Sequence, residues 1–164
     1  MLEFGSPLPE VVEALGTGLA GRELLDWGGV ALRLTGMRAV EPPEFGAGRV
    51  RWRTATPVVM KGSGRDATGA MGPREAWLLP GEPEWPAYMQ GNLRRKAETL
   101  GLDAGVELES VSWVGPKRSF AVGSGLKPGA AVEVELSGPP ETLRALWSWG
   151  LGQANSAGFG WVKA

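Results

Sequence analysis

The order of periodic segments after residue 48 constrains the fold of this chain more than any other feature. Residues 49–60 alternate between basic and apolar side chains at their start, which predicts a strand, and residues 61–72 are expected to form a polar, glycine-rich loop. Residues 84–100 repeat apolar side chains at helical spacing, and Gly101 stands where a helix C-cap is expected. The expected buried stripe of this helix consists of Trp85, Tyr88, Met89, Leu93, Ala97 and Leu100, and its polar side carries Arg94, Arg95 and Lys96.

Further strands and a second helix follow along the chain. Strands are predicted over 106–114 and 120–122, around a basic turn, and the alternation over 131–136 predicts another strand whose glutamates face solvent. A helix is expected over 140–149, because proline suits its first turn and glycine its end, and 159–162 closes the chain as a strand. Apart from the short strand at 120–122, the order is therefore β-α-β-β-α-β, which is the ferredoxin-like (RRM-like) arrangement of an α+β domain.

The first 41 residues carry a shorter pattern of the same kind. A strand is predicted over 1–5, an amphipathic helix over 7–20 and a second strand over 30–40. This β-α-β order is the second half of another ferredoxin-like unit, and 42–47 is the expected linker to the complete domain 48–164. Such a partial unit leaves a strand edge and a helix face uncovered. We therefore expect it to pack on the second domain or to complete itself across a homodimer.

The missing residue types limit the chemistry. No cysteine and no histidine occur among the 164 residues. Disulfides and thiolate ligands are therefore excluded, and a zinc hydrolase or a serine–histidine hydrolase is not expected, because histidine is the usual ligand or proton acceptor in them. We predict no metal or other cofactor. No segment has the length and apolarity of a membrane span and the N-terminus lacks the pattern of a signal peptide, so a cytoplasmic protein is expected.

Charge is distributed unevenly along the chain. Residues 1–47 contain seven acidic and three basic residues, a balance of −4, which leaves fourteen bases against eleven acids, or +3, in residues 48–164. Within the second part, residues 49–65 contain five bases and no acid, and residues 112–129 contain three bases and no acid. A polyanion would prefer these two segments, although such clusters also occur on ordinary solvated faces.

A glycine-rich segment, GLGQANSAGFG (150–160), joins the second expected helix to the last strand. Its glycines permit positive φ and the close approach of another backbone. The N–H groups between them can form a concavity that attracts anions. Spacing alone leaves two interpretations open: a cradle for an anion such as a phosphate backbone, or a turn that binds nothing.

A resemblance to a known family is carried by four segments that occur in this order: RVRWRTATPVVMK (49–61), NLRRK (92–96), PKRSF (116–120) and GLGQANSAGFGWV (150–162). They are similar to segments of the CRISPR-associated endoribonucleases of the repeat-associated mysterious protein (RAMP) superfamily. The last segment is the most specific, because its four glycines stand at fixed places between a helix and a strand. The resemblance covers most of the chain.

The resemblance implies tandem ferredoxin-like domains that bind CRISPR repeat RNA and cleave it without a metal. In that reaction a general base assists attack of a ribose 2′-hydroxyl on the adjacent phosphorus, which leaves a 2′,3′-cyclic phosphate and a 5′-hydroxyl. The chain departs from the family by lacking the first β-α-β, where the family's histidine base usually lies. Its insert 153–157 also lacks lysine and arginine. No catalytic residue is therefore assigned.

Two groups of residues are expected to bind RNA. Phosphate contacts are expected from Arg49, Arg51, Arg53, Lys61, Lys117, Arg118 and Lys127, and the loop is expected to approach the RNA through Gly150, Gly152, Gln153, Asn155, Ser156, Gly158 and Gly160. An alternative function is that of a non-catalytic subunit of a CRISPR effector complex, which holds guide RNA or protein partners on the same fold. A third is a small ferredoxin-like binding module that does not bind RNA.

Overall fold

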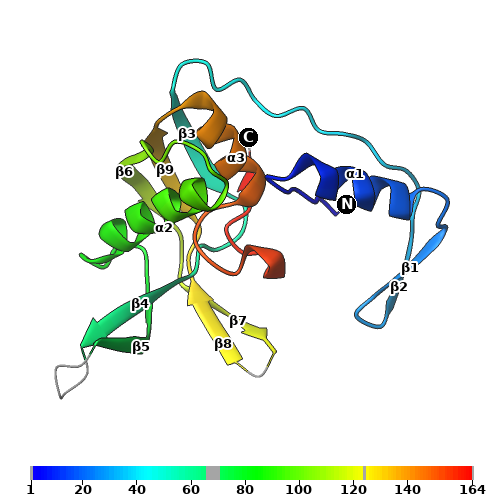
Figure 1. Ribbon diagram of the computed structural model, residues 1–164. Coiled ribbons are helices and arrows are strands. Elements are labelled where there is room, and N and C mark those ends of the chain that lie inside the picture. The colour runs from blue at the N-terminus through cyan, green and yellow to red at the C-terminus, as the bar shows by residue number, and fades with distance from the viewer. Residues whose placement is uncertain (1, 66–70, 124, 164) are drawn as a thin grey trace.

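The C-terminal part of the chain forms one four-stranded antiparallel sheet covered by two helices (Figure 1). The computed structural model describes residues 2–65, 71–123 and 125–163. The elements of this part are β3 (Arg49–Thr54), α2 (Trp85–Thr99), β6 (Glu107–Val114), β9 (Val132–Ser137), α3 (Pro140–Trp149) and β10 (Val162–Lys163). The strands pair in the order β10-β3-β9-β6, with the first and third strands of the unit in the centre. This is the ferredoxin-like order, so the predicted fold class is confirmed.

The core lies between the sheet and the helices. Burial alternates along β3, where Trp52 is buried and the arginines are exposed, and along β9, whose hydrophobic residues are buried. The buried stripe of α2 contains Trp85, Met89, Leu93 and Ala97, as predicted. Lys96 differs from the prediction, because it was expected on the polar side and is only 6% exposed. Its place three residues after Leu93 puts it on the buried stripe.

The helix ends follow the predicted signals. α3 begins at Pro140 and ends before Gly150, which has a φ of 90°. Gly101 follows the last turn of α2 with a φ of 68°. None of the helices in the described ranges is long and apolar enough to cross a membrane.

Two β-hairpins that the sequence did not predict extend from one end of the sheet (Figure 1). One pairs β4 (Met60–Arg65) with β5 (Met71–Leu78). Residues 61–65 and 71–72 of the expected loop therefore belong to paired strands, and residues 66–70 of that loop lie outside the described residues. The other pairs β7 (Arg118–Val122) with β8 (Gly125–Gly129), so the strand expected at 120–122 belongs to an insertion and not to the main sheet. Glycine weakens a strand pattern in the sequence, but a two-stranded ladder still forms where the backbone can pair.

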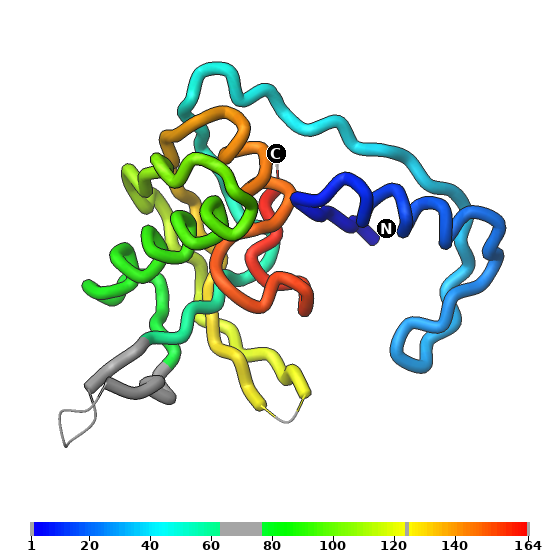
Figure 2. Tube along the Cα trace, viewed as in Figure 1, coloured from blue at the N-terminus to red at the C-terminus, as the bar shows by residue number. Residues whose placement is uncertain are grey.

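Residues 2–33 form an arm beside the domain and differ from the predicted β-α-β unit (Figure 2). α1 (Pro9–Leu19) lies within the predicted helix, and a hairpin of β1 (Leu24–Trp27) and β2 (Val30–Arg33) follows it. The strand expected at 1–5 does not form over residues 2–5, and the one expected over 30–40 ends at Arg33. Residues 2–5 and 35–40 have no strand beside them among the described residues, and a strand needs a hydrogen-bonded partner.

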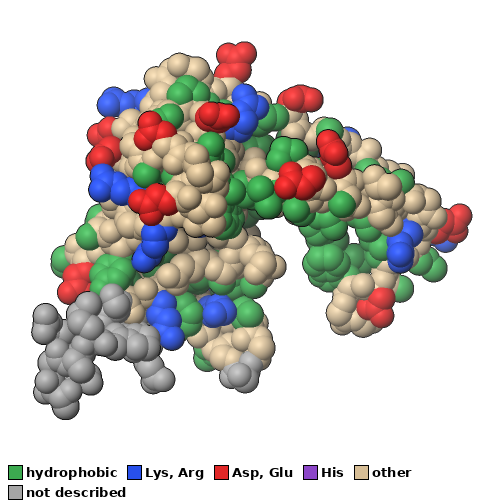
Figure 3. Space-filling view, viewed as in Figure 1, with side chains coloured by type: hydrophobic (Ala, Val, Ile, Leu, Met, Phe, Trp, Pro, Cys, Tyr) green, Lys and Arg blue, Asp and Glu red, His purple; other side chains and the backbone are tan. Residues whose placement is uncertain are grey.

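The arm exposes much of its apolar surface. The amphipathic helix predicted over 7–20 has Leu8, Val11, Val12, Leu15 and Leu19 on its apolar face, and the first four of these are 40–43% exposed. Figure 3 shows hydrophobic side chains gathered along the underside of the arm in that view. A polar contact with the domain joins the carboxylate of Glu3 to the indole N–H of Trp161 at 3.1 Å.

Candidate functional site

The glycine-rich loop 150–160 is folded tightly on its own backbone. The N–H of Leu151 donates to the carbonyl of Gly160 at 2.8 Å, and the N–H of Gly160 donates to Pro57 at 2.9 Å. A Cβ on Gly160 would lie 1.8 Å from the Leu151 oxygen, and one on Gly152 would lie 2.6 Å from a methyl group of Val58. The predicted positive φ values are confirmed, and so is the close approach of a backbone. The approaching backbone belongs to this chain, which explains the loop's shape without any ligand.

The tip of the loop leaves several amides available. Ala154 has a φ of 57°, and a short 3₁₀ turn, Asn155–Ala157, follows it. In the described part of the chain, the N–H groups of Ala154, Asn155 and Ser156 have no hydrogen-bond acceptor. Gly158, whose added Cβ would meet no atom within 4 Å, also lies at this open side. Three successive amides of this kind can face water or an anion.

A buried lysine fastens the loop to α2. The ammonium of Lys96 donates to the carbonyl of Gly150 at 2.6 Å and to Oδ1 of Asn155 at 2.7 Å. The side-chain amide of Asn155 in turn donates to the carbonyls of Leu151 at 3.0 Å and Phe159 at 2.9 Å. One amine and one carboxamide therefore hold both ends of the loop.

The environment of Lys96 also changes its ionisation. Burial lowers the pKa of Lys96 to about 7, and its Nζ lies 5.0 Å from the ring centroid of Trp149. A pKa near 7 suits a general base. Its two short hydrogen bonds to the loop and its 6% exposure instead assign this amine to loop positioning.

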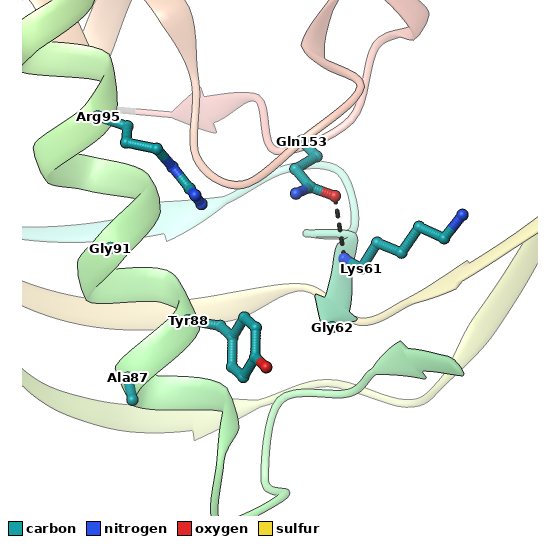
Figure 4. A pocket seen from close by; sticks show the side chains of 7 residues that line it. All are labelled: Lys61, Gly62, Ala87, Tyr88, Gly91, Arg95 and Gln153. Atoms are coloured by element: carbon teal, nitrogen blue, oxygen red, sulfur yellow. Dashed lines mark hydrogen bonds between the residues drawn. The ribbon is translucent and has the colours of Figure 1, made fainter. Parts of the chain in front are cut away.

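A groove runs along α2 between the helix and the loop. It consists of two concavities of about 480 and 430 Å³ that share Arg95 and Gln153. We call it the α2 groove and define it by Lys61, Tyr88, Gly91, Arg95, Trp149 and Gln153. Figure 4 shows Arg95 reaching from the helix towards the loop, and the ring of Tyr88 lying on the side of Gly62.

The far wall of the α2 groove is fixed by Gln153. Its backbone N–H donates to Val59 at 3.0 Å, and its Oε1 accepts the N–H of Lys61 at 2.9 Å. The amide nitrogen of the Gln153 side chain lies on the side of Arg95 (Figure 4). None of the described residues that line the groove is acidic.

The arginine row, Arg49, Arg51 and Arg53, lies on the opposite, outer face of the sheet and is paired there. Arg51 forms an ion pair with Glu135, its cross-strand neighbour, and this guanidinium lowers the pKa of Glu135. Arg49 lies 3.7 Å from Glu109, and the guanidinium of Arg53 stacks 4.1 Å from the ring centroid of Trp113. Each arginine therefore already has a partner on this face.

The remaining basic candidates belong to the hairpin β7–β8. Lys117 directly precedes β7, Arg118 begins it, and Lys127 lies on β8. The ammonium of Lys127 lies 4.9 Å from the ring centroid of Trp77 on β5, which links the two hairpins. Figure 3 shows basic side chains at the base of the two hairpins on the visible face.

The structure thus brings only part of the predicted site together. Lys61 and the loop residues Gly152, Gln153, Asn155 and Ser156 line the α2 groove, whereas the arginine row lies on the other face of the sheet. Two residues at this site were missed, Arg95 and Lys96. Both belong to the segment NLRRK (92–96). Lys96 follows the apolar Leu93 by three residues, and this spacing was the available signal that Lys96 faces inwards.

Comparisons with known proteins agree with this architecture. A family model described as "CRISPR associated protein Cas6, C-terminal" matches residues 40–164. A solved structure described as a Cas6-related gene from Pyrococcus furiosus matches with a TM-score of 0.70 at 17% identity. Two others, described as "An RAMP protein binding different RNA substrates" and "CRISPR associated protein Cas6", match with TM-scores of 0.73 at 19% identity. No curated protein matches the chain.

These matches differ in what they establish. Each structural match covers 97% of this chain and 65% of the other, so the chain spans about two thirds of the length of those proteins. At such identities the likeness shows a shared fold. The family model is more specific, because it covers more than half of the chain and includes both the α2 groove and the glycine-rich loop. The chain therefore belongs to the family of CRISPR-associated proteins that the Cas6 C-terminal model describes.

Proposed function

We propose that this chain binds CRISPR repeat RNA through the glycine-rich loop and the basic side chains beside it. The observation that carries the proposal is the preformed loop, which lies inside the segment that matches the family model. Its shape is held by Lys96 and Asn155, so binding requires little ordering of the backbone. The amides of residues 154–156 are suited to phosphate oxygens.

The basic side chains proposed to contact RNA fall into two groups, according to whether a glutamate already pairs with them. Lys61 lies next to the loop, and Lys127 contacts Trp77, the cross-strand partner of Lys61. Lys117 and Arg118 lie at the start of the same hairpin as Lys127. The arginine row is also a proposed phosphate contact, but RNA would have to compete with Glu135 and Glu109 for two of its members. We expect a smaller loss of affinity from Arg51→Ala than from Lys61→Ala.

Binding is tested by titrating the protein with labelled repeat RNA and with a scrambled RNA of the same length. Affinity for the repeat should exceed that for the scrambled RNA at least tenfold. It should fall steeply between about 50 and 200 mM salt, with a slope of about −0.7 for each phosphate contact to a single strand. Equal affinities for the two RNAs, or affinity that salt does not change, would contradict the proposal.

Cleavage is the activity that family membership suggests, and it is tested separately. The ribose 2′-oxygen would attack phosphorus as its proton passes to a base, and the bond to the 5′-oxygen would break as that oxygen takes up a proton. Cations near the phosphate would stabilise the pentavalent transition state. Repeat RNA incubated in EDTA should then yield a 2′,3′-cyclic phosphate. Intact RNA that remains bound would restrict this chain to the binding role.

A second candidate function is that of a subunit that holds RNA within a larger CRISPR assembly. The observation that favours it is the exposed apolar surface of the arm, where Leu24, Trp27 and Val30 are 53–63% exposed. Apolar patches of this kind often mark protein–protein contacts. Co-purification of other CRISPR proteins with bound guide RNA would support this function. A monomer that co-purifies with neither RNA nor protein would contradict it.

A further inference from the structure

The α2 groove and the arginine row are both basic, but their charges are compensated differently. Two arginines of the row pair with glutamates, and the third stacks on Trp113. Neither Lys61 nor Arg95 pairs with a carboxylate among the described residues, and no acidic side chain of that part of the chain lines the groove. A polyanion entering the groove therefore does not have to displace a carboxylate of the described residues.

The groove also has the size and surfaces that single nucleotides need. Its concavities of about 480 and 430 Å³ fall within the range of about 300–1,000 Å³ that is typical of small-ligand sites. An aromatic ring lies in each, Tyr88 in the first and Trp149 in the second. Basic grooves with aromatic side chains are the usual surfaces for single-stranded nucleic acid, because the bases stack while the backbone follows the charge.

We propose that a single-stranded segment of the bound RNA runs along the α2 groove, between α2 and the glycine-rich loop. This inference rests on the proposed RNA-binding function and adds the path of the strand and a contact residue, Arg95. The phosphate backbone passes Arg95 and Lys61, and the loop amides of residues 154–156 meet the same backbone at the far end. Lys96 contributes by holding the wall that the loop provides.

Gly91 is the position that makes room for the strand. It lies on the groove side of α2, midway between Tyr88 and Arg95, and an added Cβ would meet no atom within 4 Å. Glycine in a helix interior is otherwise unfavourable relative to alanine. The helix therefore keeps an open surface at this point, at a position where folding would tolerate a larger residue.

The first test compares two adjacent arginines of α2. Arg95 lines the groove, whereas Arg94 pairs with Glu107 at 2.6 Å outside it. Arg95→Ala should weaken repeat-RNA binding about tenfold and reduce the salt slope by about 0.7, and Arg94→Ala should change affinity less than twofold. Both variants lose one positive charge from an exposed position. If only the net charge of the protein mattered, the two variants would lose the same RNA affinity.

The second test blocks the groove without weakening the helix. Gly91→Ala should raise the melting temperature, because alanine favours the helix, and should weaken RNA binding far less than a longer side chain at this position does. Gly91→Glu should also keep the fold, but its carboxylate beside Arg95 should reduce affinity at least twentyfold. Thr17→Glu, at an exposed position of α1, serves as a charge control, because it adds the same charge outside the proposed RNA contacts, and it should have a smaller effect.

The outcomes separate this inference from the function on which it rests. If the unmodified protein binds repeat RNA and Gly91→Glu binds it equally well, the groove path is wrong and the RNA-binding function stands. If Arg94→Ala and Arg95→Ala lose the same affinity, the path is also wrong. If the unmodified protein does not prefer repeat RNA, both the inference and the proposed function fail.

Discussion

α1 and α2 carry the same kind of sequence pattern in very different surroundings. Each repeats apolar side chains at helical spacing and has proline in its first turn. On α2, Met89 and Leu93 are fully buried against the sheet. On α1, Val12 and Leu15 are 43% and 42% exposed, and none of the helix's residues is buried against the described part of the chain.

The difference shows what amphipathic periodicity can and cannot predict. Periodicity reports which face of a helix is apolar, and both helices form where it predicts them. It does not report which surface covers that face. The stability of the C-terminal domain should therefore respond strongly to changes on α2 and hardly at all to changes on α1.

The largest effect is expected from removing a fully buried side chain of α2. Leu93→Ala should lower the free energy of unfolding by about 4 kcal/mol, because it leaves a cavity in the core. Denaturant unfolding measures this loss, and Leu93→Met is the control, since a swap of similar volume costs less than about 1.5 kcal/mol. A loss below about 1 kcal/mol for Leu93→Ala would mean that α2 is packed no better than α1.

Gly160→Ala should have the next largest effect. The φ of 66° is strained for alanine, and its Cβ would fall 1.8 Å from the Leu151 oxygen, so the loop has to move. We expect a loss of about 3 kcal/mol and a loss of repeat-RNA binding. Gly158→Ala is the matched control, with a φ of 85° but open space around the Cβ, and should cost about 1 kcal/mol. Equal effects of the two variants would show that the loop is not closely packed.

Lys96→Met should destabilise the domain by about 2 kcal/mol. Methionine fills the space of the lysine stem but leaves the buried carbonyl of Gly150 and Oδ1 of Asn155 without their donor. The control Arg95→Met removes the same charge from an exposed neighbouring position and should change the unfolding free energy by less than about 0.5 kcal/mol. Thermal and denaturant unfolding compare the two, and similar losses would contradict the positioning role of Lys96.

The same lysine predicts a dependence on pH. Its pKa is about 7 in the native state, whereas an unfolded lysine has a pKa of about 10.4. Between these values the unfolded state binds more protons, so this group makes the free energy of unfolding rise as pH rises from about 7 to about 10. Lys96→Met lacks this contribution. The gap in melting temperature between the unmodified protein and the variant should widen from about pH 6 to about pH 9.

Much of the fold could be predicted from the sequence, because its signals are local. The β-α-β-β-α-β order, the alternation of β3 and β9 and the glycine ends of α2 and α3 all follow from periodicity and backbone preference. The hairpins could not be predicted in the same way, because β4 and β8 contain glycines that hide a strand pattern. The strand expected at residues 1–5 does not form over the described residues 2–5 for a different reason, since pairing depends on a partner that the local sequence does not specify.

The candidate site was harder to predict, since it depends on contacts between distant segments. The alternation of Arg49, Arg51 and Arg53 correctly predicts one exposed face, but the acids that pair with this face come from β6 and β9. Lys96 looked like a surface charge because it follows two arginines, and only its partners across the fold, Gly150 and Asn155, show its role. Residue type thus predicts which side chains carry charge, whereas the tertiary structure determines which charges remain available.

The smallest effect is expected from the arm. Leu15→Ala removes the same atoms as Leu93→Ala, but from a side chain that is 42% exposed, and it should change the free energy of unfolding by less than about 0.5 kcal/mol. Unfolding measured at two protein concentrations a hundredfold apart tests this directly. A loss above about 1 kcal/mol at the higher concentration alone would show that α1 is covered by a second copy of the chain. The same loss at both concentrations would show that α1 packs within one chain, and the contrast between the two helices would then be wrong.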